Sequence, residues 1–167
     1  SRAKDPKKDT FKWTYLAFWS LYQHADAFIE AWDRLKNDGV VQHNKVIGVM
    51  FPNDADGNGD RTIWPARLEA RGYKVVDAGA YQNGTEDFTF AASLFKEEGC
   101  ELVFGDMIPP DFVNWWKQCI QQGYRPKVPS MAKAILFPEA VEAAGDIASG
   151  FLGDGCWGVD WPFKSSL

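Results

Sequence analysis

The sequence predicts an α/β fold in which a doubly wound parallel sheet carries helices on both faces. Amphipathic helical segments alternate with short apolar segments along the chain, and a glycine follows most of the helical ones. Short apolar runs suit strands that are buried on both faces, and their alternation with helices implies parallel pairing through right-handed crossovers. With 167 residues, 46% of them hydrophobic and 25% charged, the chain is long enough for one large core.

The first helix has the clearest start. Residues 1–10 are expected to form a frayed lead-in, and residues 11–19 a short strand or an extended segment. Ser20 then fits an N-cap, with Gln23 three residues later as in a capping box, and Gly39 fits the stop. Between them, apolar residues recur at helical spacing: Leu21, Ala25, Phe28, Ile29, Trp32 and Leu35.

The next unit is a strand, a loop and a helix. The apolar run 45–51 predicts a strand buried on both faces, and the Asn-, Asp- and Gly-rich residues 52–60 predict a loop. We expect a helix capped by Thr62 to follow, because Pro65 is tolerated only in a first turn, and Gly72 to end it.

The same alternation continues to the end of the chain. Strands are expected at 73–78, 101–105, 128–131 and near 150–157, and helices at 87–98, 110–122 and 138–144. On the helix 110–122, Trp116 falls on the apolar face, whereas Trp115 lies about 100° around the helix and is expected to be partly exposed. We therefore treat residues 11–167 as a single α/β lobe.

Composition excludes two classes of partner. The formal net charge is −5, and no Lys/Arg cluster stands out beyond Lys4, Lys7 and Lys8, which argues against nucleic acid. No apolar run approaches the roughly 18 residues of a membrane span, so direct membrane insertion is not expected. No signal peptide opens the chain, so we expect a trimmed form or a piece of a longer protein.

The sequence predicts no cofactor and no metal. Asp54, Asp56 and Asn58 alternate as in a calcium loop, but the twelfth position of that loop is Pro65 instead of a glutamate. The glycines of 57–59 lack the third glycine of a dinucleotide fingerprint, and the P-loop sequence is absent. A polar turn is the preferred interpretation of this stretch.

Nothing in the chain assembles a nucleophile, a base and an orienting group, so we expect a binding protein and no enzyme. His24 is expected to face solvent or a cleft on the first helix and His43 to lie in a polar loop, so surface histidines are the preferred interpretation. Cys100, Cys119 and Cys156 are expected to be buried free thiols, with one disulfide as the alternative, and Cys100 and Cys119 to be close without a bond.

In open α/β sheets, ligands bind beyond the carboxyl ends of the strands. The loops 52–60, 79–86, 106–109 and 132–137 follow strands and should form any site. Trp19 lies just before the first helix, in an irregular segment where aromatic residues often line a cleft, and we assign it to the ligand site.

Several short motifs, taken in order, carry a family resemblance over residues 11–161. They are the strand 45–51, Asp-Gly-Asn-Gly at 56–59, Arg-Gly at 71–72, Gly-Thr-Glu-Asp-Phe at 84–88, Cys-Glu-Leu-Val-Phe-Gly at 100–105, Pro-Asp-Phe at 110–112, Gln-Gly at 122–123 and Gly-Asp-Ile-Ala-Ser-Gly at 145–150. This order resembles the second, C-terminal lobe of type I periplasmic binding proteins, in the branched-chain amino-acid-binding branch that serves ABC importers.

The resemblance implies a Rossmann-like lobe of a two-lobed, non-catalytic protein that closes on a small solute. It implies a periplasmic or extracellular location, and membrane-embedded ABC permease subunits as partners of the full-length protein. At the positions that contact ligand in the family, this chain has Asp56, then Met107, Ile108 and Pro109, and finally Ala132 or Lys133.

Two of these positions depart from the family. Asp56 replaces a tyrosine, and Lys133 or Ala132 replaces the acid that receives the ammonium of an amino acid. A lysine pairs with a carboxylate instead. The sequence therefore leaves both an amino acid and an organic or aromatic acid open as the solute.

Two other functions remain as alternatives. One is the ligand-sensing lobe of a receptor or transcriptional regulator with the same fold. The other is a flavodoxin-like or dinucleotide-dependent enzyme.

Overall fold

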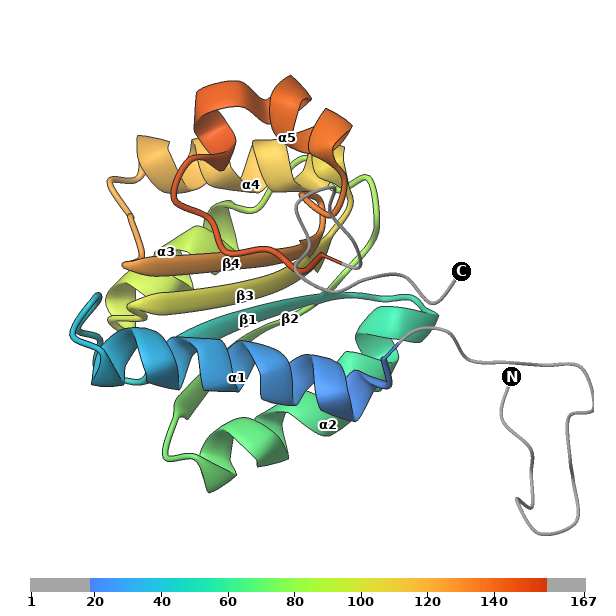
Figure 1. Cartoon of the computed structure of the whole chain (residues 1–167). Helices are drawn as coiled ribbons and strands as arrows, with labels where there is room; N and C mark the ends of the chain where they lie inside the picture. Colours follow the sequence, from blue (N-terminus) through green and yellow to red (C-terminus); the bar gives the residue numbers. More distant parts are fainter. Residues whose placement is uncertain (1–18, 156–167) are drawn as a thin grey trace, which may run out of the picture.

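A computed structural model describes residues 19–155, and helices alternate with strands throughout this range (Figure 1). The strands are β1 (Val46–Pro52), β2 (Lys74–Tyr81), β3 (Leu102–Met107) and β4 (Val128–Lys133). The helices are α1 (Leu21–Asn37), α2 (Ala55–Ala70), α3 (Thr89–Glu97), α4 (Pro109–Gln121) and α5 (Pro138–Ala144), followed by a 3-10 turn, η1 (Gly145–Ala148). The predicted order of elements is confirmed over this range.

The four strands form one parallel sheet in the order β2-β1-β3-β4. In its centre, Gly48 of β1 lies opposite Val76 on one side and Val103 on the other. Beyond β4, Leu152 pairs with Ser130 as an isolated parallel bridge. The predicted last strand near 150–157 is thus present as this bridge, and its part from Cys156 onward lies outside the described residues.

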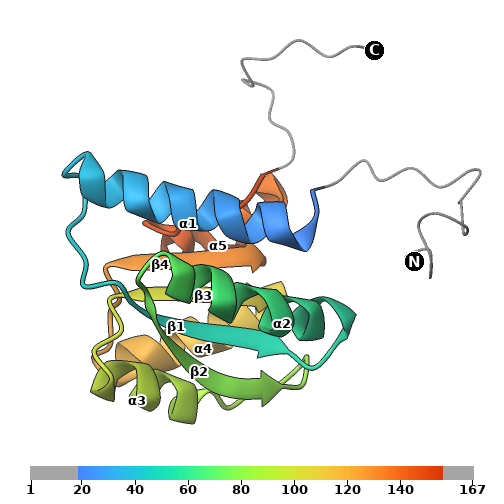
Figure 2. The same ribbon diagram turned by 90° about the horizontal axis from the view of Figure 1, so that it is seen from below.

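Helices cover both faces of the sheet, as the doubly wound prediction requires. Figures 1 and 2 show α1 and α2 on one face and α3 and α4 on the other. The core under α1 and α2 is mainly aromatic, and Trp64 of α2 stacks on Phe104 of β3 with ring centroids 4.0 Å apart. Stacked rings of this kind add to the stabilisation from burial.

Helix α1 begins as predicted. The Ser20 hydroxyl accepts from the Gln23 backbone N–H, and the Gln23 side chain accepts from the Ser20 N–H, which completes the capping box. Such a cap contributes about 1 kcal/mol.

Helix α2 begins earlier than predicted, at Ala55, and the expected loop 52–60 is largely helical. Asp54 is the N-cap, since its carboxylate accepts from the Gly57 N–H at 2.9 Å. A Cβ at Gly57 would lie 2.0 Å from the Pro52 carbonyl oxygen, so this glycine permits a close approach of helix and strand. Thr62 caps nothing, because its hydroxyl donates to the Asn58 carbonyl, and Pro65 lies inside the helix.

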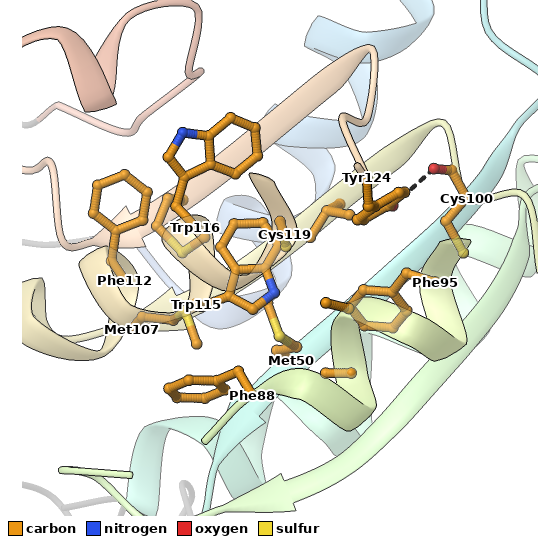
Figure 3. Close-up of a cluster of buried hydrophobic side chains, with 14 of the residues drawn as sticks. Met50, Phe88, Phe95, Cys100, Met107, Phe112, Trp115, Trp116, Cys119 and Tyr124 are labelled. Atoms are coloured by element: carbon orange, nitrogen blue, oxygen red, sulfur yellow. Dashed lines mark hydrogen bonds between the residues drawn. The ribbon is translucent and has the colours of Figure 1, made fainter. Parts of the chain in front are cut away.

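The core under α3 and α4 contains two cysteines, Cys100 and Cys119 (Figure 3). Cys100 and Cys119 are buried free thiols, and burial raises the pKa of each to about 12. The Tyr124 backbone N–H donates to the Cys119 carbonyl, and its hydroxyl donates to the Cys100 carbonyl, each at 2.8 Å. The expectation that these two cysteines are buried and unbonded is confirmed, and both carbonyls are hydrogen-bonded to one residue, Tyr124; Cys156 lies outside the described residues.

The prediction that Trp115 is partly exposed is wrong. Trp115 is fully buried and Trp116 nearly so. The sheet covers one side of α4, and Phe151 packs against both indole rings from the other, with its centroid 4.8 Å from that of Trp116. The contact with Phe151 buries Trp115 on a side of α4 that the sheet does not cover, whereas Lys117, about 100° further around the helix from Trp116, stays exposed.

Candidate functional site

A cavity of about 370 Å³ lies at the carboxyl ends of the central strands. Its lining comes from α1, α2, β3, β4 and the segments that follow the strands: Trp19, Leu21, His24, Asp56, Asp60, Asp106, Ala132, Lys133, Leu136 and Asp154. Three of the predicted ligand residues, Trp19, Asp56 and Lys133, meet here although they are far apart in sequence. The strand-end argument thus located a real cavity.

Lys133 is at the centre of the charge arrangement. Its Nζ lies 2.9 Å from Asp106 Oδ2 and 3.1 Å from Asp56 Oδ2. Burial disfavours the ammonium, but the hydrogen bonds and charges of the two aspartates outweigh it and raise the pKa of Lys133. The backbone of Lys133 has φ 59°, a left-handed conformation that L-residues rarely adopt, so the ion pairs hold a strained turn in place.

The two partners of Lys133 differ in exposure. The side chain of Asp106 is 4% exposed, whereas that of Asp56 is 65% exposed. Burial raises the pKa of Asp106 even though the lysine opposes the shift. Asp106 is therefore the fixed partner of Lys133, and Asp56 is the one that another anion can replace.

Asp60 is a second buried carboxylate that lines the cavity. It is 2% exposed and accepts from Trp64 Nε1 at 3.1 Å. Burial, and then the charge of Asp106, raise the pKa of Asp60 to about 6. The cavity therefore holds two buried carboxylates, Asp60 and Asp106, whose pKa values are both raised by burial.

Sequence reasoning missed Asp60 and Asp106. Asp106 had a usable signal, because it is a charged residue within the carboxyl end of an otherwise apolar strand. Asp60 gave no such signal in the sequence, because residues 52–60 were interpreted as a loop. Its side chain points inward only because α2 already starts at Ala55.

The remaining predicted ligand residues do not line this cavity. Met107 is fully buried in the core on the α3 and α4 face, and Ile108 is the half-buried N-cap of α4. Pro109 is exposed and lines a separate cavity of about 410 Å³ between α4 and α5. Met107 is paired with Lys133 in the register of β3 and β4, but none of these three residues lines the cavity.

The preferred interpretation of both histidines as surface residues is wrong, although His24 does line a cavity, which was the alternative given for it. His24 is 8% exposed and His43 is 4% exposed. His43 Nε2 donates to the Trp32 carbonyl at 3.2 Å, and its Nδ1 accepts from the Lys45 N–H at 3.3 Å. Burial is the main cause that lowers the pKa of His43, which keeps this ring neutral in the core. The amphipathic spacing of α1 places His24 toward the sheet, next to the cavity.

The Asp- and Asn-rich turn has structural roles. Asp54 caps α2 and also accepts from the Asn83 side chain at 2.9 Å. Across residues 19–155, no group of three or more His, Cys, Asp or Glu residues is arranged to hold a metal ion. In the same range no helix is long and apolar enough to cross a membrane.

The fold is similar to that of solved transport proteins. A branched-chain amino acid ABC transporter from Thermus thermophilus with bound valine gives a TM-score of 0.69 at 21% identity, over 83% of this chain and 35% of its own. A leucine-binding protein from Thermotoga maritima gives 0.65 at 19% identity, over 81% and 37%. A solute-binding protein of an R. palustris ABC transporter, in complex with 4-hydroxybenzoate, gives 0.53 at 19% identity, over 70% and 32%.

The chain thus spans about a third of the length of these proteins. No curated protein matches it in sequence. A family model described as periplasmic binding protein matches residues 2–157, which is nearly the whole chain. With the parallel sheet, its order of elements and the cavity at the strand ends, this match shows that the chain belongs to the periplasmic binding protein family.

Proposed function

We propose that this chain is a ligand-binding lobe of an extracytoplasmic solute-binding protein that delivers a small organic solute to an ABC importer. One observation carries the proposal: Trp19, Asp56 and Lys133 come from separate parts of the chain and line one cavity at the carboxyl end of the sheet. Membership of the family and the similarity to transporter binding proteins support it.

The mechanism is binding without chemistry. In this proposal a second lobe closes over the cavity, and the ligand stabilises the closed state through contacts that exist only there. The lobe described here supplies one wall, so it leaves a ligand largely in contact with water. We therefore expect the chain alone to bind its solute weakly.

We propose an acid as the solute, either an amino acid or an organic or aromatic acid. The carboxylate of the solute takes the place of the exposed Asp56 at Lys133, while the buried Asp106 stays paired. After this exchange the ammonium of Lys133 still faces two carboxylates. The only side chain that has to move is Asp56, which is already mostly exposed to water. Two of the similar proteins were solved with valine and with 4-hydroxybenzoate, both of which carry a carboxylate.

The test is a titration of the ¹⁵N-labelled chain, followed by NMR, with valine, benzoate and 4-hydroxybenzoate. At least one acid should shift amide signals at Asp56 and Lys133, with an affinity in the millimolar range. Lys133→Met should weaken this binding by about tenfold or more, because it removes one partner of a charge pair. Lys127→Met is the control, since Lys127 pairs with Glu101 at the opposite end of the sheet.

Two results would contradict the proposal. If no acid shifts the signals at the strand ends, the cavity is not the solute site. If the chain alone binds an acid with submicromolar affinity, the half-site mechanism is wrong.

A further inference from the structure

A second cavity adjoins the first, between α1 and residues 152–155. Its volume is about 490 Å³, within the usual range of small-molecule pockets. It is lined mainly by aromatic, small and aliphatic residues: Trp19, Gln23, His24, Ala27, Phe28, Ala31, Leu152, Gly153, Asp154 and Gly155. The two cavities share Trp19, His24 and Asp154, so one solute can reach both.

His24 and Asp154 place polar atoms in this apolar surrounding. Among residues 19–155, His24 Nε2 and Asp154 Oδ1 are buried and form no hydrogen bond. His24 Nε2 nevertheless lies in ion-pair contact with Asp154 Oδ2, at 3.3 Å, whereas Asp154 Oδ1 has no hydrogen bond among these residues. A buried polar atom without a hydrogen bond is costly, so a ligand that bonds to both atoms gains what the protein alone leaves unused.

The position of the imidazole is fixed by its neighbours. The Trp19 ring stacks on it with centroids 5.7 Å apart, and the Phe28 ring contacts it edge-on at 5.2 Å. Trp64 and Phe104 contact it from the core at 5.9 and 6.0 Å. The side chain of His24 is 9% exposed and lines the cavity, and these ring contacts fix its orientation before a ligand binds.

We propose that this cavity binds the ring of a hydroxylated aromatic solute, whose hydroxyl group is held by His24 and Asp154. A hydroxyl can donate its proton to the Asp154 carboxylate and accept from the N–H of His24. Trp19 and Phe28 supply aromatic walls, and Ala27, Ala31 and Gly153 leave room for a flat ring. A carboxylate does not suit this place, because Asp154 would repel it.

This inference rests on the proposed function, since it assigns the far end of the same solute. It predicts that the hydroxyl adds affinity independently of any acid group at Lys133. The probes are therefore the uncharged pair 4-hydroxybenzamide and benzamide, which differ only in the hydroxyl.

We would titrate the chain with both probes and follow the amide signals of α1 and of residues 152–155 by NMR. The hydroxylated probe should bind about tenfold more tightly or better, as expected for a hydrogen bond to a charged group. His24→Phe keeps a ring in the same place and should abolish this preference. His43→Phe removes the other buried imidazole, which lies outside the cavity, and should leave the preference unchanged.

The outcomes separate the two proposals. Equal binding of both probes, or an unchanged preference in His24→Phe, overturns the assignment of the hydroxyl. If acids still shift the signals at Asp56 and Lys133 in that case, the proposed function stands alone. If neither acids nor benzamides shift any signal, both proposals fail.

Discussion

The two ends of the sheet treat polar groups in opposite ways. At the amino end, the Asn44 N–H donates to Glu101 at 2.7 Å, its side chain donates to the Gly99 carbonyl, and both ring nitrogens of His43 are hydrogen-bonded. At the carboxyl end, Asp60 and Asp106 are buried with raised pKa values, and His24 Nε2 has no hydrogen bond among the described residues.

This difference is the one expected between a structural end of the sheet and the binding end that we propose. Polar groups at the amino end satisfy one another and so join β1 and β3 to their neighbours. At the carboxyl end, buried carboxylates and an imidazole nitrogen without a hydrogen bond lower the stability of the folded state. Such destabilising groups are typical of functional sites. Substitutions at the two ends should therefore have different effects on stability, and five single substitutions test this.

Lys133→Met should have the largest effect. It leaves Asp106 buried with no cation beside it, which we expect to reduce the free energy of unfolding by about 3 kcal/mol near neutral pH. The loss should shrink as the pH falls, because protonation of Asp106 removes the uncompensated charge. Urea unfolding at several pH values measures both.

The companion variant is the double substitution Asp106→Asn with Lys133→Met. If the loss comes from the unpaired carboxylate, the double variant should be more stable than Lys133→Met alone. A double variant that is no more stable than Lys133→Met would show that the unpaired carboxylate of Asp106 is not the cause of the loss.

Asp60→Asn should stabilise the protein. The pKa of Asp60 is raised from 3.8 to about 6, so between these values the folded state binds more protons than the unfolded state. Stability from this group is therefore highest below about pH 4 and falls as the pH rises to about 6. Asparagine still accepts from Trp64 and carries no charge, so the gain above pH 6 should be on the order of 2 kcal/mol. Urea unfolding of both proteins from acid to neutral pH tests this, and a pH profile identical to that of the original protein would contradict it.

Much of the fold could be predicted because its signals are local. The capping box at Ser20, the apolar run of β1 and the glycines after the helices each specify their own element. The start of α2 could not be predicted in this way. Gly57 resembles a loop residue in sequence, and only the contact with Pro52 across the turn shows why a glycine stands in a helix.

The site was predicted only where topology determined it. Strand ends and the family resemblance led to Asp56 and Lys133, but the same resemblance also pointed to Met107, which is buried in the core. Asp154 and His24 are 130 residues apart, and only the tertiary structure brings them together. A sequence carries no local signal for such a pair.

One buried histidine lies at each end of the sheet, His43 at the amino end and His24 at the carboxyl end, so the same substitution can be compared at both. His43→Phe removes hydrogen bonds to the Trp32 carbonyl and the Lys45 N–H and should cost about 1–3 kcal/mol. His24→Phe removes no hydrogen bond within the described residues, but it removes the 3.3 Å contact of Nε2 with the Asp154 carboxylate, so it should cost less than about 1 kcal/mol. Thermal unfolding of both variants gives the comparison, and equal losses would mean that the contact with Asp154 stabilises the protein as much as the hydrogen bonds of His43 do.

Lys127→Met should have the smallest effect and provides the control for Lys133. Lys127 Nζ lies 2.7 Å from Glu101 Oε1, a shorter distance than either ion pair of Lys133, but its side chain is 49% exposed. Water competes for an exposed pair, and Glu101 keeps its hydrogen bond from Asn44, so the loss should stay below about 1 kcal/mol. Salt at about 0.5 M should remove most of it, since the Debye length then falls to a few ångströms. Losses of the same size for Lys127→Met and Lys133→Met, with the same salt dependence, would show that burial of the carboxylate partner does not separate the two ends of the sheet.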